Sequence, residues 1–244
     1  MHLKLATWPE VEAYLSRSTG IVIPIGSTEQ HGPTGLIGTD IICPETIAEG
    51  MAAEGILIGP SLNIGMAQHH LAFPGSVALR PSTLMAVVRD VVTSLASQGF
   101  RHFYFLNGHG GNIASVQAAF AEIWAEASMA GQASGLNLRL GNWFAGARVR
   151  ELSQSLYGAA DGAHATASEI SLTWHAYPEA VREYRFDPER APNGPIRDAH
   201  DFRGRFPDGR MGSEPARASA EHGAQFMHAA LADALADYRD LLSG

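Results

Sequence analysis

Three short segments of this chain carry acidic side chains and histidines at spacings that can bind metal ions. The first segment, STEQHGPTGLIGTD (27–40), follows an apolar, β-branched run and contains Glu29, His31 and Asp40. Ligands of doubly wound sheets collect outside the carboxyl ends of the strands, so these side chains can converge on one point there. The alternative is a polar turn in which Asp40 caps the helix that follows.

The second segment is NGHGGN (107–112), at the predicted end of one strand and the start of a helix. His109 stands between glycines, which let the backbone come close to a ligand or an ion. Glycines before a helix are also typical of phosphate sites. The order differs from G-x-G-x-x-G, however, which disfavours a dinucleotide site. The other alternative is a tight turn with His109 directed to solvent.

The third segment is DGAHATASEISL (161–172), in which a helix is predicted to start between His164 and Glu169. The alternative for this segment is a plain capping arrangement. In that case Thr166 or Ser168 caps the helix and Glu169 lies in its first turn.

Together the segments offer oxygen and nitrogen ligands without sulfur. The candidate metal ligands are Glu29, His31, Asp40, His109 and Glu169. Such a set suits Zn²⁺, Mn²⁺, Fe²⁺ or Co²⁺. Five ligands, three of them carboxylates, exceed the usual set of one catalytic zinc. The set therefore predicts two divalent metal ions that share a carboxylate.

The composition of the 244 residues excludes several other chemistries. The single cysteine, Cys43, excludes an intrachain disulfide and a multi-cysteine metal site. The single lysine, Lys4, lies outside any glycine-rich loop, which excludes a P-loop. A formal net charge of −8 without a basic run argues against nucleic acid and anionic membranes as partners. The 11 histidines, with Asp and Glu, are left as the residues for catalysis.

No signal peptide and no membrane span are expected, because the chain has neither an N-terminal apolar segment nor a long apolar stretch. This predicts a cytoplasmic location.

An alternation of strands and helices must position the three segments. Strands are predicted at 20–26, 56–60, 101–107 and 136–142, and helices at 9–16, 44–54, 82–98, 112–130 and 218–242. This order predicts an α/β fold: one three-layer domain over 1–244, with a mostly parallel sheet flanked by helices. Residues 184–216 are rich in Arg, Asp, Pro and Gly and are interpreted as a long ordered loop.

Two features outside the three segments have open interpretations. His69 and His70 precede an FPG sequence and either line the site or lie on the surface or in an oligomer contact. Trp143 follows a predicted strand and is either part of the core or a pocket aromatic, with the core favoured.

The chain resembles the creatininase (creatinine amidohydrolase) family. The resemblance rests on five motifs in order: PIGSTEQHGPTGLIGTD (24–40), FPGSVALRP (73–81), NGHGGN (107–112), HATASE (164–169) and GSEPARASAEHG (212–223). Members of this family are metal-dependent hydrolases of amide and cyclic-amide C–N bonds. The resemblance implies a creatininase-like α/β fold, two metal ions and a homo-oligomer, often a hexamer.

The resemblance also assigns roles to the ligands. It implies that Glu29, Asp40 and His109 hold one metal ion. It implies that His31 and Asp40 hold the other, with Asp40 as the bridge.

One position departs from the pattern of creatininase proper. A further Glu ligand of that enzyme falls on Gly111 in this sequence. Glu169 is the residue best placed to replace it, as the His-x4-Glu motif does in other members. His164 matches the catalytic histidine of the family.

The expected activity is hydrolysis of the C–N bond of a cyclic amide, a formamide or a related small amide by a metal-activated hydroxide. His164 would donate a proton to the leaving nitrogen. The NGHGGN motif is more similar to the deformylases and the cofactor-precursor peptidase of the family than to creatinine hydrolases. The alternatives are a peptidase-like activity, a sugar isomerase or lyase activity on the same two metal ions, and a binding module with a structural metal.

Overall fold

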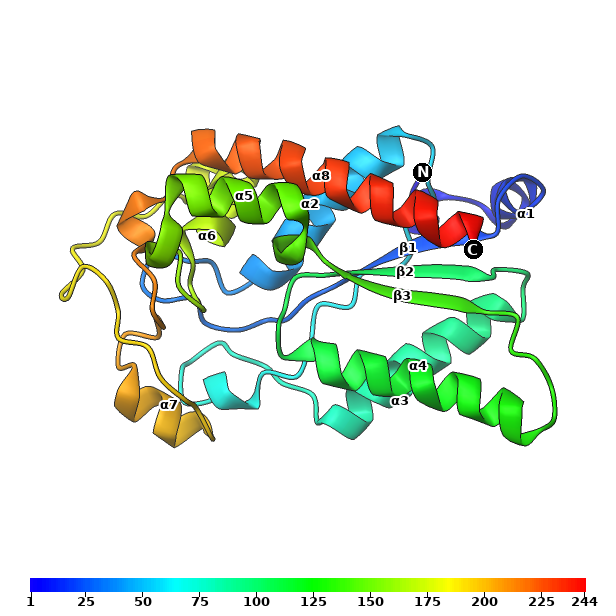
Figure 1. The fold of residues 1–244 in the computed structure, drawn as a ribbon, viewed down its shortest axis with the longest axis horizontal. Coiled ribbons are helices and arrows are strands. Elements are labelled where there is room, and N and C mark those ends of the chain that lie inside the picture. The colour runs from blue at the N-terminus through cyan, green and yellow to red at the C-terminus, as the bar shows by residue number, and fades with distance from the viewer.

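The computed structural model describes residues 1–244, and its centre is a parallel sheet in the order β1-β2-β3 (Figure 1). The strands are β1 (Gly20–Ile25), β2 (His102–Asn107) and β3 (Asn137–Asn142). Ile25 pairs with Asn107 and Asn107 pairs with Asn142, so the three strands end at the same level. The loops that follow them therefore leave one edge of the sheet together.

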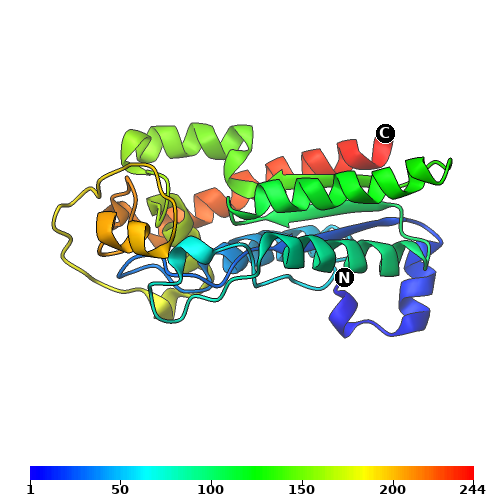
Figure 2. The same ribbon diagram turned by 90° about the horizontal axis from the view of Figure 1, so that it is seen from below.

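Helices cover both faces of the sheet, as the two views show (Figures 1 and 2). They are α1 (Trp8–Leu15), α2 (Thr39–Ala53), α3 (Pro81–Ala96), α4 (Asn112–Met129), α5 (Ala147–Leu156), α6 (Ala167–Ala176), α7 (Ala199–Arg205) and α8 (Ala220–Ser243). Helices α3 and α4 lie on one face, and α2, α5, α6 and α8 lie on the other (Figure 1). The predicted three-layer α/β architecture is confirmed.

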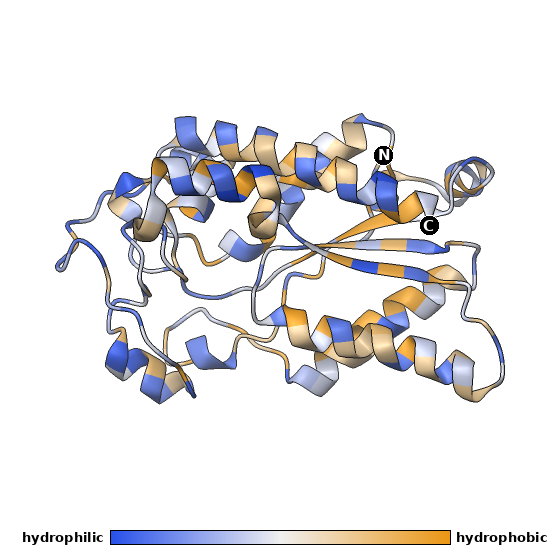
Figure 3. Cartoon of the chain, in the orientation of Figure 1, coloured by the Kyte–Doolittle hydropathy of each residue, from blue (hydrophilic) through white to orange (hydrophobic).

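The apolar sequence of β1 follows from burial on both faces. Ile21, Ile23 and Ile25 pack into the core under α3 and α4, whereas Val22 packs into the core under α2 and α8. Strands of parallel sheets that are covered on both sides are typically apolar throughout. Figure 3 shows β1 as a hydrophobic strand between the two layers. No helix of the structure is both long enough and apolar enough to span a bilayer.

The strand predicted at 56–60 does not form a regular strand. The segment runs beside β1, where Val22 N donates to Leu57 O at 3.0 Å and Gly59 N donates to Val22 O at 2.7 Å. Pro24 of β1 has no N–H to donate to this segment, so the ladder is interrupted after Gly59 and resumes at Leu62, whose N donates to Pro24 O at 2.9 Å. The segment therefore extends the sheet only as isolated bridges.

The helix predicted at 44–54 begins earlier, at Thr39, and includes Pro44. The alternative in which Asp40 is the N-cap is wrong, because Gly38 is the cap and Asp40 lies inside the first turn. Pro44 has no N–H for the Asp40 carbonyl. That carbonyl instead lies against Gly26 and Gly108, where a Cβ atom would overlap it. The first turn of α2 is thus held between the ends of β1 and β2.

The segment 184–216 is largely irregular, as expected, but contains the short helix α7. It is tied to the third motif by backbone hydrogen bonds from Ala163 N to Met211 O (2.9 Å) and from Met211 N to His164 O (3.2 Å). Its side chains Phe202 and Phe206 form a small core with Phe73. The segment therefore packs over the ends of the strands.

Candidate metal centre

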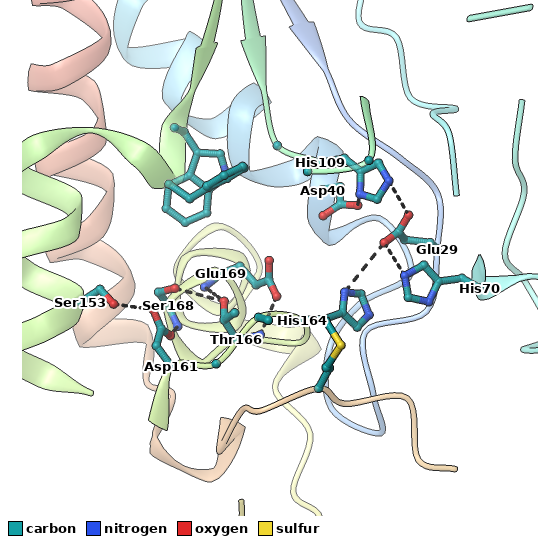
Figure 4. Close-up of a pocket in the computed structure, with 18 of the residues that line it drawn as sticks. Glu29, Asp40, His70, His109, Ser153, Asp161, His164, Thr166, Ser168 and Glu169 are labelled. Atoms are coloured by element: carbon teal, nitrogen blue, oxygen red, sulfur yellow. Dashed lines mark hydrogen bonds and ion pairs between the residues drawn. The ribbon is translucent and has the colours of Figure 1, made fainter. Parts of the chain in front are cut away.

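The structure brings all five predicted ligands and His164 together at the carboxyl ends of the strands. Figure 4 shows Glu29, Asp40, His109 and Glu169 around His164. Three groups of side chains can each offer ligand atoms that lie within 4.8 Å of one another. They are Glu29, Asp40 and His109; His31, Asp40 and Glu169; and Glu29, His31 and His164. The groups overlap, since Glu29, His31 and Asp40 each belong to two of them. Segments 130 residues apart in the sequence thus supply one cluster of side chains.

Asp40 lies between two histidines from different loops. Its Oδ1 is 3.1 Å from Nε2 of His31, and its Oδ2 is 2.9 Å from Nδ1 of His109. The Asn107 side chain holds the backbone of His109 on both sides, accepting from His109 N at 3.1 Å and donating to His109 O at 2.7 Å. Asp40 is therefore shared between the first and second motifs.

Glu29 is fully buried among histidines. Its Oε1 lies 3.1 Å from Nε2 of His70 and 3.9 Å from Nδ1 of His164, and its Oε2 lies 3.3 Å from Nε2 of His109. Desolvation in this position, together with the charge of Asp40, raises the pKa of Glu29.

Glu169 combines the two interpretations that the sequence left open. Thr166 caps α6 by accepting from Glu169 N at 3.2 Å, and Glu169 Oε1 accepts from Thr166 N at 2.5 Å. This is a capping box. The other oxygen, Oε2, remains directed at His31, 3.9 Å from its Nε2. Capping therefore fixes Glu169 and leaves one oxygen for the cluster.

The carboxylates control the protonation of the histidines between them. Burial lowers the pKa of His31, but the charges of Asp40 and Glu169 outweigh burial and raise this pKa to about 10. Burial is likewise outweighed at His109, where Glu29 and Asp40 raise the pKa to about 9. The carboxylates of the cluster thus favour positive charge on these two histidines although both are buried.

The donor set fits divalent cations. Three buried carboxylate oxygens, Glu29 Oε1, Glu29 Oε2 and Asp40 Oδ2, receive no hydrogen bond from the protein. Imidazole nitrogens face these oxygens at 2.9 to 3.3 Å without the alignment of a hydrogen bond. A buried carboxylate without a partner is costly unless a cation compensates it. Carboxylate and imidazole donors without sulfur suit zinc, manganese and iron.

Gly111 is the position at which the resemblance to the creatininase family led us to expect the additional Glu ligand of creatininase proper. It is the N-cap of α4, and a Cβ atom on it would overlap Nε2 of His109 and the carbonyl of Met66. His109 Nε2 lies 3.1 Å from Met66 O. The absence of a side chain at Gly111 therefore leaves room for His109 in its present position.

Sequence reasoning missed Gln30, which links the two histidines around Glu29. Its side chain Nε2 lies 2.9 Å from His70 Nδ1, 2.9 Å from His164 Nε2 and 2.9 Å from Gly209 O. The sequence did contain a signal for Gln30, because this residue stands between two of the predicted metal ligands, Glu29 and His31. Of the two histidines left open, His70 is buried against Glu29 and His69 lines the pocket beside it.

The cluster lies in the wall of a cavity of about 500 Å³. Trp143, which is nearly buried, lines this cavity together with Phe144, so its expected place in the core is only part of its role. The segment 184–216 contributes Ile196, Phe202 and Met211. Cavities of this size with convergent polar groups are typical small-molecule sites.

Fold and site define the class: an α/β protein with a buried carboxylate–imidazole centre suited to divalent metal ions. The family model for creatininase, described as creatinine amidohydrolase, matches residues 4–238. The chain belongs to the creatininase family and has its metal-dependent amidohydrolase fold.

Curated relatives carry different names. A mycofactocin precursor peptide peptidase of Mycobacterium ulcerans (strain Agy99) is 29% identical over 72% of this chain and 62% of the relative. A creatinine amidohydrolase of Pseudomonas putida is 31% identical over 42% of each chain. A 3-dehydro-scyllo-inosose hydrolase of Thermotoga maritima is 26% identical over 82% of this chain and 63% of the relative. The chain thus spans less than two thirds of these relatives.

Solved structures show the same fold. A structure named Creatininase Mn superposes with a TM-score of 0.87 at 23% identity, and the match covers 100% of this chain and 99% of that structure's chain. A creatininase mutant described as of Zn–Zn type gives a TM-score of 0.85 at 23% identity, covering 100% and 98%.

Proposed function

We propose that the protein is a metal-dependent hydrolase that cleaves the C–N bond of a cyclic amide, a formamide or a related small amide. The observation that carries this proposal is the pair of donor groups that share Asp40 at the wall of the cavity, with His164 beside them. Membership of the creatininase family supports a hydrolase. The names of the relatives have hydrolysis in common and differ in substrate.

Two ions would be held by the two groups. Glu29, Asp40 and His109 would bind one, and His31, Asp40 and Glu169 the other, with Asp40 between them. Divalent ions in such a centre polarise a carbonyl group and allow water to act as a nucleophile near neutral pH. Zinc, manganese and iron all suit these ligands.

His164 is the residue that would move the proton. Burial and the neighbouring His31 and His70 lower its pKa well below the ordinary value, so the ring is neutral at neutral pH. Its Nε2 lies 2.9 Å from Gln30 O, and its Nδ1 faces Glu29. A neutral Nδ1 accepts a proton as water adds to the carbonyl carbon and returns it to the leaving nitrogen.

Aromatic side chains pack around this histidine. Phe202, which is fully buried, lies with its ring centroid 6.0 Å from that of His164 and 4.6 Å from that of His70. Trp143 forms another part of the cavity wall. Apolar walls beside the buried carboxylates lower the local dielectric constant, which strengthens the interactions of a reacting carbonyl group with the charges around it.

The proposal is tested by metal content and by the fate of solvent oxygen. Purified protein is expected to hold one to two transition-metal ions per chain by elemental analysis. A screen of small formyl amides and cyclic amides in ¹⁸O-water should place the label in the acid product. Turnover without the label would instead identify the isomerase or lyase alternative, since only hydrolysis adds solvent oxygen.

A further inference from the structure

Arg150 is the only lysine or arginine in the wall of the cavity. It lies on α5, one face of which borders the cavity. This face consists of Val149, Arg150, Ser153 and Gln154. The carboxylate–imidazole cluster belongs to the same cavity but comes from other elements, so a bound molecule can contact both.

The guanidinium group of Arg150 has no partner in the protein. No carboxylate lies within ion-pair distance of it, and its side chain makes no hydrogen bond. Arg148, two residues earlier, differs in this respect, since its Nη1 lies 2.8 Å from Asp233 Oδ1. Arg148 does not border the cavity. The two arginines thus share a helix but have different environments.

The remaining acidic residue of the cavity wall is also unavailable to Arg150. Asp161 lies outside the donor groups, and both of its oxygens are engaged: Oδ1 accepts from Ser168 N at 2.9 Å and Oδ2 accepts from Ser153 Oγ at 2.5 Å. Arg150 is exposed to solvent and has no protein partner, so a ligand bound in the cavity can pair with its guanidinium group.

The scaffold fixes the helix that carries Arg150. Asp233 of α8 accepts from Arg148 N at 3.0 Å, which anchors the first turn of α5. At the other end, the Tyr157 hydroxyl lies 2.9 Å from Ser171 Oγ on α6 and 2.8 Å from His222 Nδ1 on α8. A binding group on such a helix is positioned more accurately than one on a loop.

We propose that Arg150 binds a carboxylate of the substrate, so that the substrate is an amide with a free carboxylate, such as an N-acyl amino acid. This inference rests on the proposed hydrolase function. The planar guanidinium group matches a carboxylate in a bidentate pair. Gln154, one turn further along the same face, adds a neutral donor without a protein partner. A single cation matches a monoanion better than a phosphate dianion.

Matched pairs of ligands test this proposal. The probes are the N-formyl derivatives of glycine, leucine and phenylalanine, each compared with the N-formyl derivative of the matching amino alcohol, which lacks the carboxylate. Zinc-loaded protein is assayed by initial rates for deformylation and by calorimetry for binding. The variants are Arg150→Met and Arg150→Lys, with Arg148→Met as the control that removes the same charge from the same helix.

The wild-type protein is expected to favour at least one acid over its alcohol by about ten- to a hundredfold in KM or Kd, the usual effect of a charge-assisted hydrogen bond. Arg150→Met removes this preference without changing affinity for the alcohol. Arg150→Lys retains part of it, and Arg148→Met retains all of it.

Two results would overturn the proposal: no preference for the acid in any of the three pairs, or a preference that survives in Arg150→Met. The second result would mean that the carboxylate binds elsewhere, for instance to the metal ions. A preference in binding without turnover of any probe would support the carboxylate site and contradict the hydrolase function.

Discussion

Nε2 of His164 lies 2.9 Å from the backbone carbonyl oxygen of Gln30, and this contact fixes the tautomer of the histidine. The two hydrogens of the Gln30 side-chain amide are taken by Gly209 O and His70 Nδ1. His164 Nε2 therefore carries its own hydrogen and donates it to the carbonyl. The lone pair of a neutral His164 is then on Nδ1, which faces Glu29.

Gln30→Met should lower kcat by about ten- to a hundredfold, as is usual when residues that orient the ligands of a metal site are changed. The thioether cannot donate to His70 or to Gly209, so His70 loses its fixed orientation beside Glu29 and His164, whereas the backbone carbonyl that holds His164 remains. Metal content by elemental analysis should stay close to that of the wild type. The exposed Gln98→Met serves as the control. An unchanged kcat in Gln30→Met would show that the hydrogen bonds of the side-chain amide to His70 and Gly209 do not contribute to activity.

Asp40→Ala should remove most of the bound metal, because Asp40 belongs to both of the donor groups that would hold the two ions. The comparison is Asp161→Ala, which removes a carboxylate from the same cavity outside these groups. Elemental analysis after gel filtration measures the metal per chain. A full complement of metal in Asp40→Ala would rule out its role as the shared ligand.

His164→Ala should retain metal but lose activity. His164 belongs to only one donor group, whereas the five predicted ligands remain in place. The expected loss in kcat is about a hundred- to ten-thousandfold, the contribution of a general acid or base. Rates and metal content are measured on the same preparation. Loss of the metal together with activity would assign His164 to the ligands instead.

Gly111→Ala and Gly110→Ala form a pair that tests the space around His109. A Cβ atom at Gly111 would overlap the His109 ring and Met66 O, whereas one at Gly110 has no neighbour within 4 Å. The first variant should bind metal more weakly by at least tenfold, measured by competition with a chelator. The second should bind it normally. Equal affinities would show that His109 can move without loss.

Arg210→Met should loosen the segment 184–216. The Arg210 side chain is fully buried, with Nη1 donating to Glu189 O at 2.7 Å and Nη2 donating to Pro188 O at 2.8 Å. Its guanidinium carbon also lies 4.3 Å from the centroid of the Phe186 ring.

Loss of these charge-assisted hydrogen bonds should cost about 3 kcal/mol of stability. Limited proteolysis should then cleave 184–216 faster than in the wild type, and Arg203→Met, on the exposed side of the same segment, provides the comparison. Equal cleavage rates in the two variants would contradict an anchoring role for Arg210.

The sequence alone determined the layered α/β fold and the identity of the clustered side chains. Both are written in short stretches of sequence. The uninterrupted apolar run of β1 indicates a strand that is buried on both faces, and Thr166 with Glu169 forms the capping box that starts α6. Such patterns depend on neighbours within a few residues, so they can be recognised without the fold.

Only the tertiary structure decided how the segments meet. The start of α2 depends on Gly26 and Gly108 packing against the Asp40 carbonyl, a contact between residues far apart in the chain. The same holds for the role of Gln30 between His70 and His164, and for Arg150 bordering the cavity without a partner. These features arise from distances between elements, which periodicity and spacing along one chain do not encode.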